Sequence, residues 1–277
     1  MTESPPIEIT HDFQPRPLRA AILDFDGTLS LLRRNWQQVM IPMMLRILQQ
    51  TGSDESDQQL EMLVKQFVTQ LTGKQTIYQM IQLAEEVQLR GGQPQQPLEY
   101  KQQYHQLLMQ QVEGRLAGVR SGEIPVDSMR VPGSLELLEC LRDNGLELYL
   151  ASGTDLVYVE QEVKLLGLDQ FFGKHIYGAV DDYKNFSKAM IIEQMIDKIG
   201  LEPEQLLGFG DGYVEIEQVR KVGGLAVGVA SNELTREGID PWKRERLTAA
   251  GANMIIPDYR DLAGLMNALG LAAPRTS

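Results

Sequence analysis

The chain has 277 residues, a formal net charge of −12 and one cysteine. Its 26 Lys and Arg against 38 Asp and Glu argue against a partner that is nucleic acid or an anionic membrane, because both need clustered cations on the protein. The single cysteine, Cys140, excludes an internal disulfide and a cysteine-based zinc site, and its helical context predicts a core thiol. No run reaches the ~18 apolar residues of a membrane span, and the first residues lack a secretory pattern, so we expect a cytoplasmic protein.

The first half of the chain changes character twice. Residues 1–17 are rich in proline and polar side chains, which predicts a loosely ordered N-terminal arm. A short apolar run at 18–23 predicts a buried strand. Residues 32–130 are then helical in pattern and rich in glutamine, with apolar side chains at helical spacing. Pro42 falls inside the first of these helical segments and predicts a kink or a break there.

From Val131 onward, predicted strands alternate with predicted helices. The helix that opens this part has Ser134 as its expected N-cap and Gly145 as its stop. Further strands are predicted at 146–152, 175–180, 205–211, 225–231 and 252–258. This alternation is typical of a Rossmann-like α/β fold, a parallel sheet joined by right-handed crossovers.

The strand at 18–23 has the same buried, apolar character as the later strands. We therefore expect one α/β core domain made of 18–31 and 131–277, interrupted by an inserted all-helical cap domain at 32–130. The insertion leaves the core directly after the first strand. Ligands bind at the carboxyl ends of the strands in open α/β sheets, so the insertion is expected to cover a ligand site.

Polar residues gather where the predicted strands end, and the set is Asp24, Asp26, Ser152, Lys184, Lys188, Asp211 and Glu215. Taken singly, each has a simpler interpretation as a helix cap, a turn residue or a solvated side chain. Together they meet at one sheet edge, where clustered carboxylates repel one another unless a cation joins them. An oxygen-only donor set favours Mg²⁺. A carboxylate can also attack phosphorus, while a lysine, a hydroxyl and backbone N–H groups near Gly153 hold phosphoryl oxygens.

The order of these motifs resembles that of the haloacid dehalogenase (HAD) superfamily. DFDGT at 24–28 is followed by a strand ending at Ser152, by a lysine, and by GDGYVE at 210–215. The resemblance covers the α/β part of the chain. The helical insertion between the first two motifs resembles the C1-type cap of sugar-phosphate phosphatases and mutases in that superfamily.

The resemblance implies a role for each motif residue. Asp24 would be the nucleophile, and Asp26 the general acid and base. Lys188 is favoured over Lys184 as the motif lysine, because it opens the helix that leads to Asp211 at the spacing seen in similar phosphatases. The implied metal ligands for Mg²⁺ are Asp24, Asp211 and Glu215, together with Asp26 through its backbone carbonyl. The expected set that binds phosphate and substrate is Gly27, Thr28, Lys74, Ser152, Gly153 and Lys188.

These roles together predict a Mg²⁺-dependent phosphatase that acts on a small phosphorylated metabolite, such as a sugar phosphate, through an aspartyl-phosphate. A phosphomutase of the β-phosphoglucomutase type and a catalytically silent binding protein on the same fold are the alternatives. Asp26 argues against a dehalogenase or a phosphonatase within the superfamily, because neither uses this second aspartate. The sequence leaves the oligomeric state open.

Substrate choice is expected to rest with the cap. Lys74 lies in a Gly-containing segment between two predicted cap helices, where it can reach the leaving group. Arg33, Arg34 and Lys74 are either substrate residues or hinge and surface residues. The basic tract at 240–247 is interpreted as a solvated helix start in preference to a substrate-side loop.

Overall fold

The computed structural model describes residues 7–180 and 187–273, so Lys184 lies outside the described residues. Within this part of the chain a seven-stranded sheet has the order β1-β7-β6-β5-β2-β3-β4. The strands are β1 (Glu8–Ile9), β2 (Ala20–Leu23), β3 (Glu147–Asp155), β4 (Ile176–Ala179), β5 (Leu206–Gly210), β6 (Leu225–Val229) and β7 (Met254–Ile256). Every neighbouring pair is parallel except β1 and β7, which are antiparallel.

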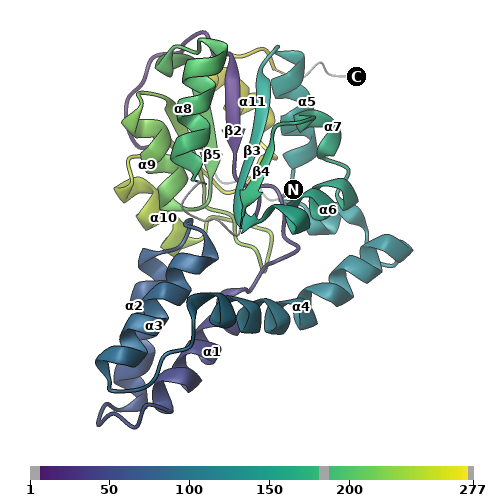
Figure 1. The fold of residues 1–277 in the computed structure, drawn as a ribbon. Coiled ribbons are helices and arrows are strands. Elements are labelled where there is room, and N and C mark those ends of the chain that lie inside the picture. The colour runs from purple at the N-terminus through teal and green to yellow at the C-terminus, as the bar shows by residue number, and fades with distance from the viewer. Residues whose placement is uncertain (1–6, 181–186, 274–277) are drawn as a thin grey trace.

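Helices cover both faces of the sheet (Figure 1). One face carries α8 (Lys188–Ile199), α9 (Tyr213–Lys221) and α10 (Pro241–Ala249), and the other carries α5 (Ser134–Asp143), α6 (Leu156–Leu165), α7 (Asp169–Phe172) and α11 (Leu262–Leu269). Strand β2 serves both layers because successive side chains point to opposite faces. Ala21 and Leu23 join one apolar cluster, whereas Ala20 and Ile22 join the other. The predicted parallel α/β fold is confirmed.

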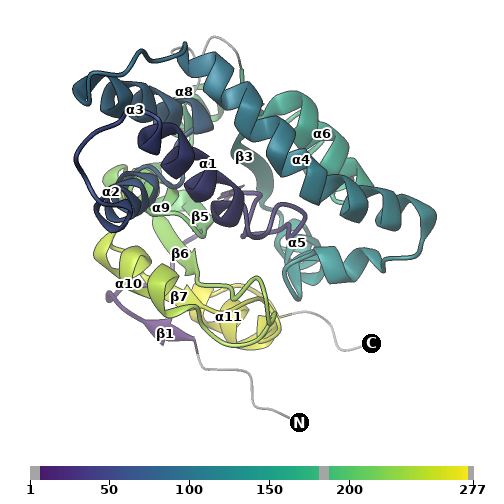
Figure 2. The same cartoon turned by 90° about the horizontal axis from the view of Figure 1, so that it is seen from below.

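Four cap helices lie beyond one end of the sheet: α1 (Gln37–Gln49), α2 (Asp57–Gln70), α3 (Thr76–Leu89) and α4 (Pro97–Ser121) (Figures 1 and 2). Ser56 and Gln59 form a capping box that starts α2, and a proline in the first turn starts α4. Helix α1 continues through Pro42 without the expected break. A proline removes one intrahelical N–H bond, and the burial of Met43 and Met44 beside it offsets that loss.

Two short segments connect the cap helices to the core, and they pair with each other. Leu31 N–H donates to Met129 O at 2.8 Å, and Val131 N–H donates to Leu29 O at 3.0 Å. The two connections therefore lie side by side where the chain enters and leaves the cap. The exact domain boundaries at 31/32 and 130/131 stay a prediction.

Two local predictions are corrected. Residues 8–9, expected within a loose arm, form β1 on the edge of β7, where they satisfy backbone groups that would otherwise be unpaired. Ser134, expected as the N-cap of its helix, is the first residue of α5, and Gly133 takes the N-cap position with φ +79°. A Cβ at Gly133 would lie 2.6 Å from the Tyr259 backbone, so this close approach requires glycine. No helix in the described residues is both long and apolar enough to span a bilayer.

Candidate active site

A tight turn at the carboxyl end of β2 carries both aspartates. Asp24 N–H donates to Phe209 O at 3.0 Å, which extends the pairing of β2 with β5 by one residue. The chain then turns through Gly27, which has φ +78°. A Cβ at Gly27 would lie 2.1 Å from Asp211 Oδ2, so glycine allows the turn and the carboxylate after β5 to approach each other. This contact explains why the DFDGT segment needs its glycine.

Lys188 joins Asp24 to Glu215 within the core. Its Nζ lies 2.5 Å from Asp24 Oδ1 and also donates to Glu215 Oε1. The lysine is the first residue of α8, whose N-cap Ser187 accepts from Met190 N–H. All three charged side chains are at most 8% exposed. Lys188 therefore provides the positive charge that stabilises two buried carboxylates.

The pKa values in this group follow from burial and charge. Burial raises the pKa of Asp24 well above its usual value, Lys188 opposes the rise, and the Glu215 and Asp211 carboxylates add to it. Burial opposes the charge on Lys188, yet the Asp24 and Glu215 carboxylates raise the pKa of this lysine overall. Lys188 therefore stays protonated at neutral pH.

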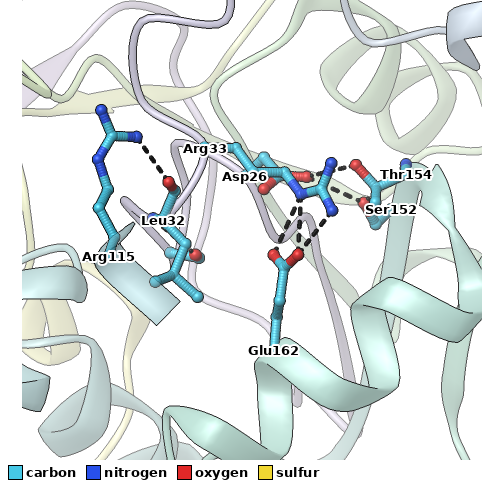
Figure 3. A network of polar contacts seen from close by, with 8 residues as sticks. Asp26, Leu32, Arg33, Arg115, Ser152, Thr154 and Glu162 are labelled. Carbon is cyan, nitrogen blue, oxygen red and sulfur yellow. Dashed lines mark hydrogen bonds and ion pairs between the residues drawn. The ribbon is translucent and has the colours of Figure 1, made fainter. Parts of the chain in front are cut away.

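Asp26 has hydroxyl partners in place of a lysine (Figure 3). Thr154 Oγ1 donates to Asp26 Oδ2 at 2.8 Å, and Ser152 Oγ donates to the same oxygen at 3.3 Å. Burial raises the pKa of Asp26 to about 6, with the charge of Arg33 opposing the rise. A carboxyl group with that pKa can both give and take a proton near neutral pH.

Asp211 pairs with Lys243, a residue of the basic tract at 240–247. Lys243 Nζ lies 2.8 Å from Asp211 Oδ2 and 2.7 Å from Glu233 Oε1, and it also bonds Ser231 Oγ at 3.2 Å. Ser231 in turn donates to Gly27 O at 2.7 Å. The interpretation of the tract as merely solvated is wrong at this position, because the lysine is buried against the carboxylate that follows β5.

One cavity of about 110 Å³ brings most of the predicted residues together. The predicted residues that line it are Asp24, Asp26, Lys74, Ser152, Gly153, Lys188, Asp211 and Glu215. Gly27 and Thr28 are buried and do not line it. The cap forms the opposite wall with Arg33, Trp36, Met40, Thr72, Gly73, Thr76, Gln79, Tyr104 and Leu108. The roles assigned to these side chains stay predictions.

The segment 72–75 brings the cap against the core. A Cβ at Gly153 would lie 3.1 Å from Lys74 O, and one at Gly212 would lie 3.2 Å from Gly73 Cα. On the same side, Arg246 of α10 donates to Thr69 O at the end of α2, and Tyr213 donates to Gln70 O. The core therefore holds the carboxyl end of α2 next to the cavity.

Several residues of the site carried no interpretable signal in the sequence. Thr154 follows Ser152 by two positions and only the fold shows that both bond Asp26. Glu162 looks like an ordinary charged residue of α6, yet it forms a buried ion pair with Arg33, at 2.6 Å between Oε1 and Nη2. These pairs join segments more than a hundred positions apart in the chain.

The donor set of the cavity suits a hard divalent cation in kind but not in arrangement. Four carboxylates line the cavity, and Asp26 Oδ1 and Glu215 Oε2 are buried without a hydrogen-bond partner in the described residues. Such acceptor oxygens fit Mg²⁺ in kind. In the described part of the chain, however, no three His, Cys, Asp or Glu side chains converge on one point. Lys188 and Lys243 instead pair with the carboxylates of this site.

A model of the haloacid dehalogenase-like hydrolases matches residues 18–223. The chain belongs to this family. No curated protein sequence matches this HAD-like hydrolase closely enough to count as a relative.

Solved structures share the fold of this HAD-like hydrolase over nearly its whole length. A predicted phosphoglycolate phosphatase from Haemophilus somnus has 16% identity and a TM-score of 0.58, with 91% of this chain and 99% of that chain covered. A β-phosphoglucomutase from Clostridium difficile has 14% identity and a TM-score of 0.59, with 91% and 97% covered. A HAD family hydrolase from Deinococcus radiodurans, with bound phosphate and sodium, has 16% identity and a TM-score of 0.54, with 93% and 99% covered. At these identities the similarity establishes the fold.

Proposed function

We propose that this HAD-like hydrolase is a Mg²⁺-dependent phosphatase that hydrolyses a small phosphorylated metabolite, a sugar phosphate or a similar phosphomonoester. The observation that carries the proposal is the pairing of two different carboxyl groups in one cavity. Asp24 is held by a buried lysine at 2.5 Å, while Asp26, two residues on, is held by hydroxyls and has a pKa of about 6. The bound phosphate in the Deinococcus structure supports the substrate class.

In the first step an Asp24 carboxylate oxygen attacks phosphorus. The bond between phosphorus and the leaving-group oxygen breaks, and the protonated Asp26 gives its proton to that oxygen. The product is an alcohol and an aspartyl-phosphate on Asp24. Lys188 and the Ser152 hydroxyl are positioned on the same cavity to hold the phosphoryl oxygens during this transfer.

In the second step water hydrolyses the aspartyl-phosphate. The Asp26 carboxylate takes a proton from water, the water oxygen bonds to phosphorus, and the bond from phosphorus to Asp24 breaks. Inorganic phosphate leaves, and Asp26 is protonated again. The cap helices limit the access of water to the cavity until the alcohol has left.

The carboxylates of Asp24, Asp211 and Glu215 and the backbone carbonyl of Asp26 would hold the Mg²⁺ ion that the HAD superfamily generally uses. When bound, the ion supplies positive charge that stabilises the phosphoryl group in the transition state. Loading it requires Lys188 or Lys243 to release part of its contact with these carboxylates, since both lysines now pair with them.

The test is a phosphate-release screen over some tens of phosphorylated metabolites, with and without Mg²⁺. We expect Mg²⁺-dependent release from a few related compounds and none from the Asp24→Asn variant, whose circular dichroism should match that of the parent. Release that persists in Asp24→Asn would contradict the assignment of the nucleophile. A substrate whose phosphate moves to another hydroxyl, without free phosphate, would instead show a phosphomutase.

A further inference from the structure

Arg33 occupies an unusual place for a charged side chain. It lies in the connection between the Asp26 turn and helix α1, it is 7% exposed, and it lines the candidate active-site cavity. Figure 3 shows its guanidinium against the Glu162 carboxylate, and Arg33 is near enough to Asp26 for its positive charge to oppose the rise in the pKa of that carboxyl group. The residue therefore lies next to the group that would protonate the leaving oxygen.

Two side chains of α6 hold the Arg33 guanidinium in one orientation. Its Nε is 3.1 Å from both carboxylate oxygens of Glu162, and its Nη2 is 2.6 Å from Oε1. The ring of Tyr158 adds a contact at 5.6 Å from the guanidinium carbon. Glu162 and Tyr158 both belong to α6, so the core fixes the plane of this group.

The backbone on either side of Arg33 is held as well. Arg115 of α4 donates from Nη1 to Leu32 O at 2.7 Å (Figure 3), and it also donates from Nη1 to Arg34 O at 3.1 Å. A cap helix thus fixes the main chain while a core helix fixes the side chain. Such preorganisation is what a binding group needs, because little rotamer freedom is lost when the ligand arrives.

One edge of the guanidinium is left for a ligand. Nε and Nη2 are used by Glu162, and Nη1 donates to none of the described residues. The buried Tyr104 hydroxyl lies on the same cavity wall. When the phosphoester oxygen of a substrate lies next to Asp26, the neighbouring substituent of the leaving group would lie within reach of Arg33 Nη1.

We propose that Arg33 is a specificity residue, which donates from Nη1 to an uncharged oxygen substituent next to the phosphoester on the leaving group. Glu162 is its positioning residue. Because Glu162 already balances the charge of Arg33 in a buried pair, a carboxylate substituent would add an uncompensated charge. A hydroxyl satisfies the donor without that cost. This inference rests on the proposed phosphatase function.

Three probes of similar size separate the possibilities: glycerol 3-phosphate with an adjacent hydroxyl, phosphoglycolate with a carboxylate, and propyl phosphate with neither. We expect kcat/KM for glycerol 3-phosphate to exceed that for propyl phosphate by about 10- to 100-fold, as for a hydrogen bond to a charged group. Phosphoglycolate should fall below glycerol 3-phosphate. An equal rate for all three, or a preference for phosphoglycolate, would overturn the assignment.

The double variant Arg33→Met/Glu162→Met removes both charges and keeps apolar bulk in the pocket. We expect the ratio of kcat/KM for glycerol 3-phosphate to kcat/KM for propyl phosphate to fall to about one in this variant, because the donor that distinguishes the two probes is gone. If the double variant does not fold, Arg33→Lys, which keeps the charge beside Glu162 but not the planar fork, should also lose the preference. A preference that survives would refute the proposal.

Arg90→Met provides the matched control. Arg90 also forms ion pairs with two glutamates, at 2.6 Å each, and it is 12% exposed in the cap, but it does not line the candidate active-site cavity. Its probe preference should equal that of the parent. The phosphatase function and the role of Arg33 can fail separately. If the parent enzyme releases phosphate from no phosphomonoester, including 4-nitrophenyl phosphate, the phosphatase function is overturned and the role of Arg33 with it.

Discussion

Lys188→Met tests how the site tolerates its buried charges. Lys188 Nζ is 2.5 Å from Asp24 Oδ1, and at an effective dielectric constant of about 20 that distance corresponds to about 7 kcal/mol of gross attraction. The cost of desolvating both charges offsets most of this attraction. Removal of Lys188 alone, however, leaves the Asp24 and Glu215 carboxylates buried without their positively charged partner. We expect a loss of about 3–5 kcal/mol in the free energy of unfolding, measured in urea with a chelator present.

The loss should also depend on pH, with a sign that follows from the pKa of Asp24. Burial already raises this pKa above its value in the unfolded chain, and the variant lacks the lysine that opposes the rise. The folded state then binds more protons than the unfolded state, so stability falls as pH increases. We expect a larger loss at about pH 8 than at about pH 5.

Lys65→Met is the matched control, because the Lys65–Glu61 pair is 57% and 45% exposed and its loss should cost less than about 1 kcal/mol. A Lys188→Met loss as small as this, or equal at both pH values, would refute the reasoning.

Two further predictions concern activity. Asp26→Asn should lower kcat by about 10²–10⁴-fold. We expect the activity of the parent to decline above about pH 6, where Asp26 gives up its proton, and we expect this decline to be absent from the pH–rate profile of the variant. A smaller loss would make Asp26 a positioning residue. Arg246→Met should raise KM several-fold with little change in thermal unfolding, because Arg246 holds the end of α2 next to the cavity. Arg244→Met, which removes only an exposed ion pair on the same helix, should leave KM unchanged, and equal KM values for both variants would contradict the role of Arg246.

The α/β part of the fold was predictable because its signals are local. Each central strand is a short apolar run such as Ala20–Leu23, and helices with clear stops separate these runs. The errors come from interactions that a local pattern does not carry. The strand at 8–9 exists because β7 offers an unpaired edge, and Gly133 replaces Ser134 as the cap because Tyr259 lies against it.

The residues of the candidate active site also divide into those that local sequence predicts and those that it does not. Asp24, Asp26 and Asp211 follow β2 and β5, and Ser152 lies in the last part of β3, so parallel topology alone predicts that they meet. The partners that set their chemistry are less predictable. Glu162 lies in the middle of a helix, and its partner Arg33 is 129 positions away, so nothing in the local sequence distinguishes it from a solvated glutamate.

Burial has opposite consequences for the two aspartates of the turn. A pKa of about 6 suits Asp26 to its proposed role as acid and base, but the raised pKa of Asp24 opposes its proposed role as a nucleophile, which needs the ionised form. Lys188 lowers the pKa of Asp24 without cancelling the effects of burial and of the Glu215 and Asp211 carboxylates. A divalent cation among these carboxylates would supply the missing positive charge and ionise Asp24. The proposed dependence on Mg²⁺ therefore has a physical reason, because a bound cation would keep the proposed nucleophile ionised.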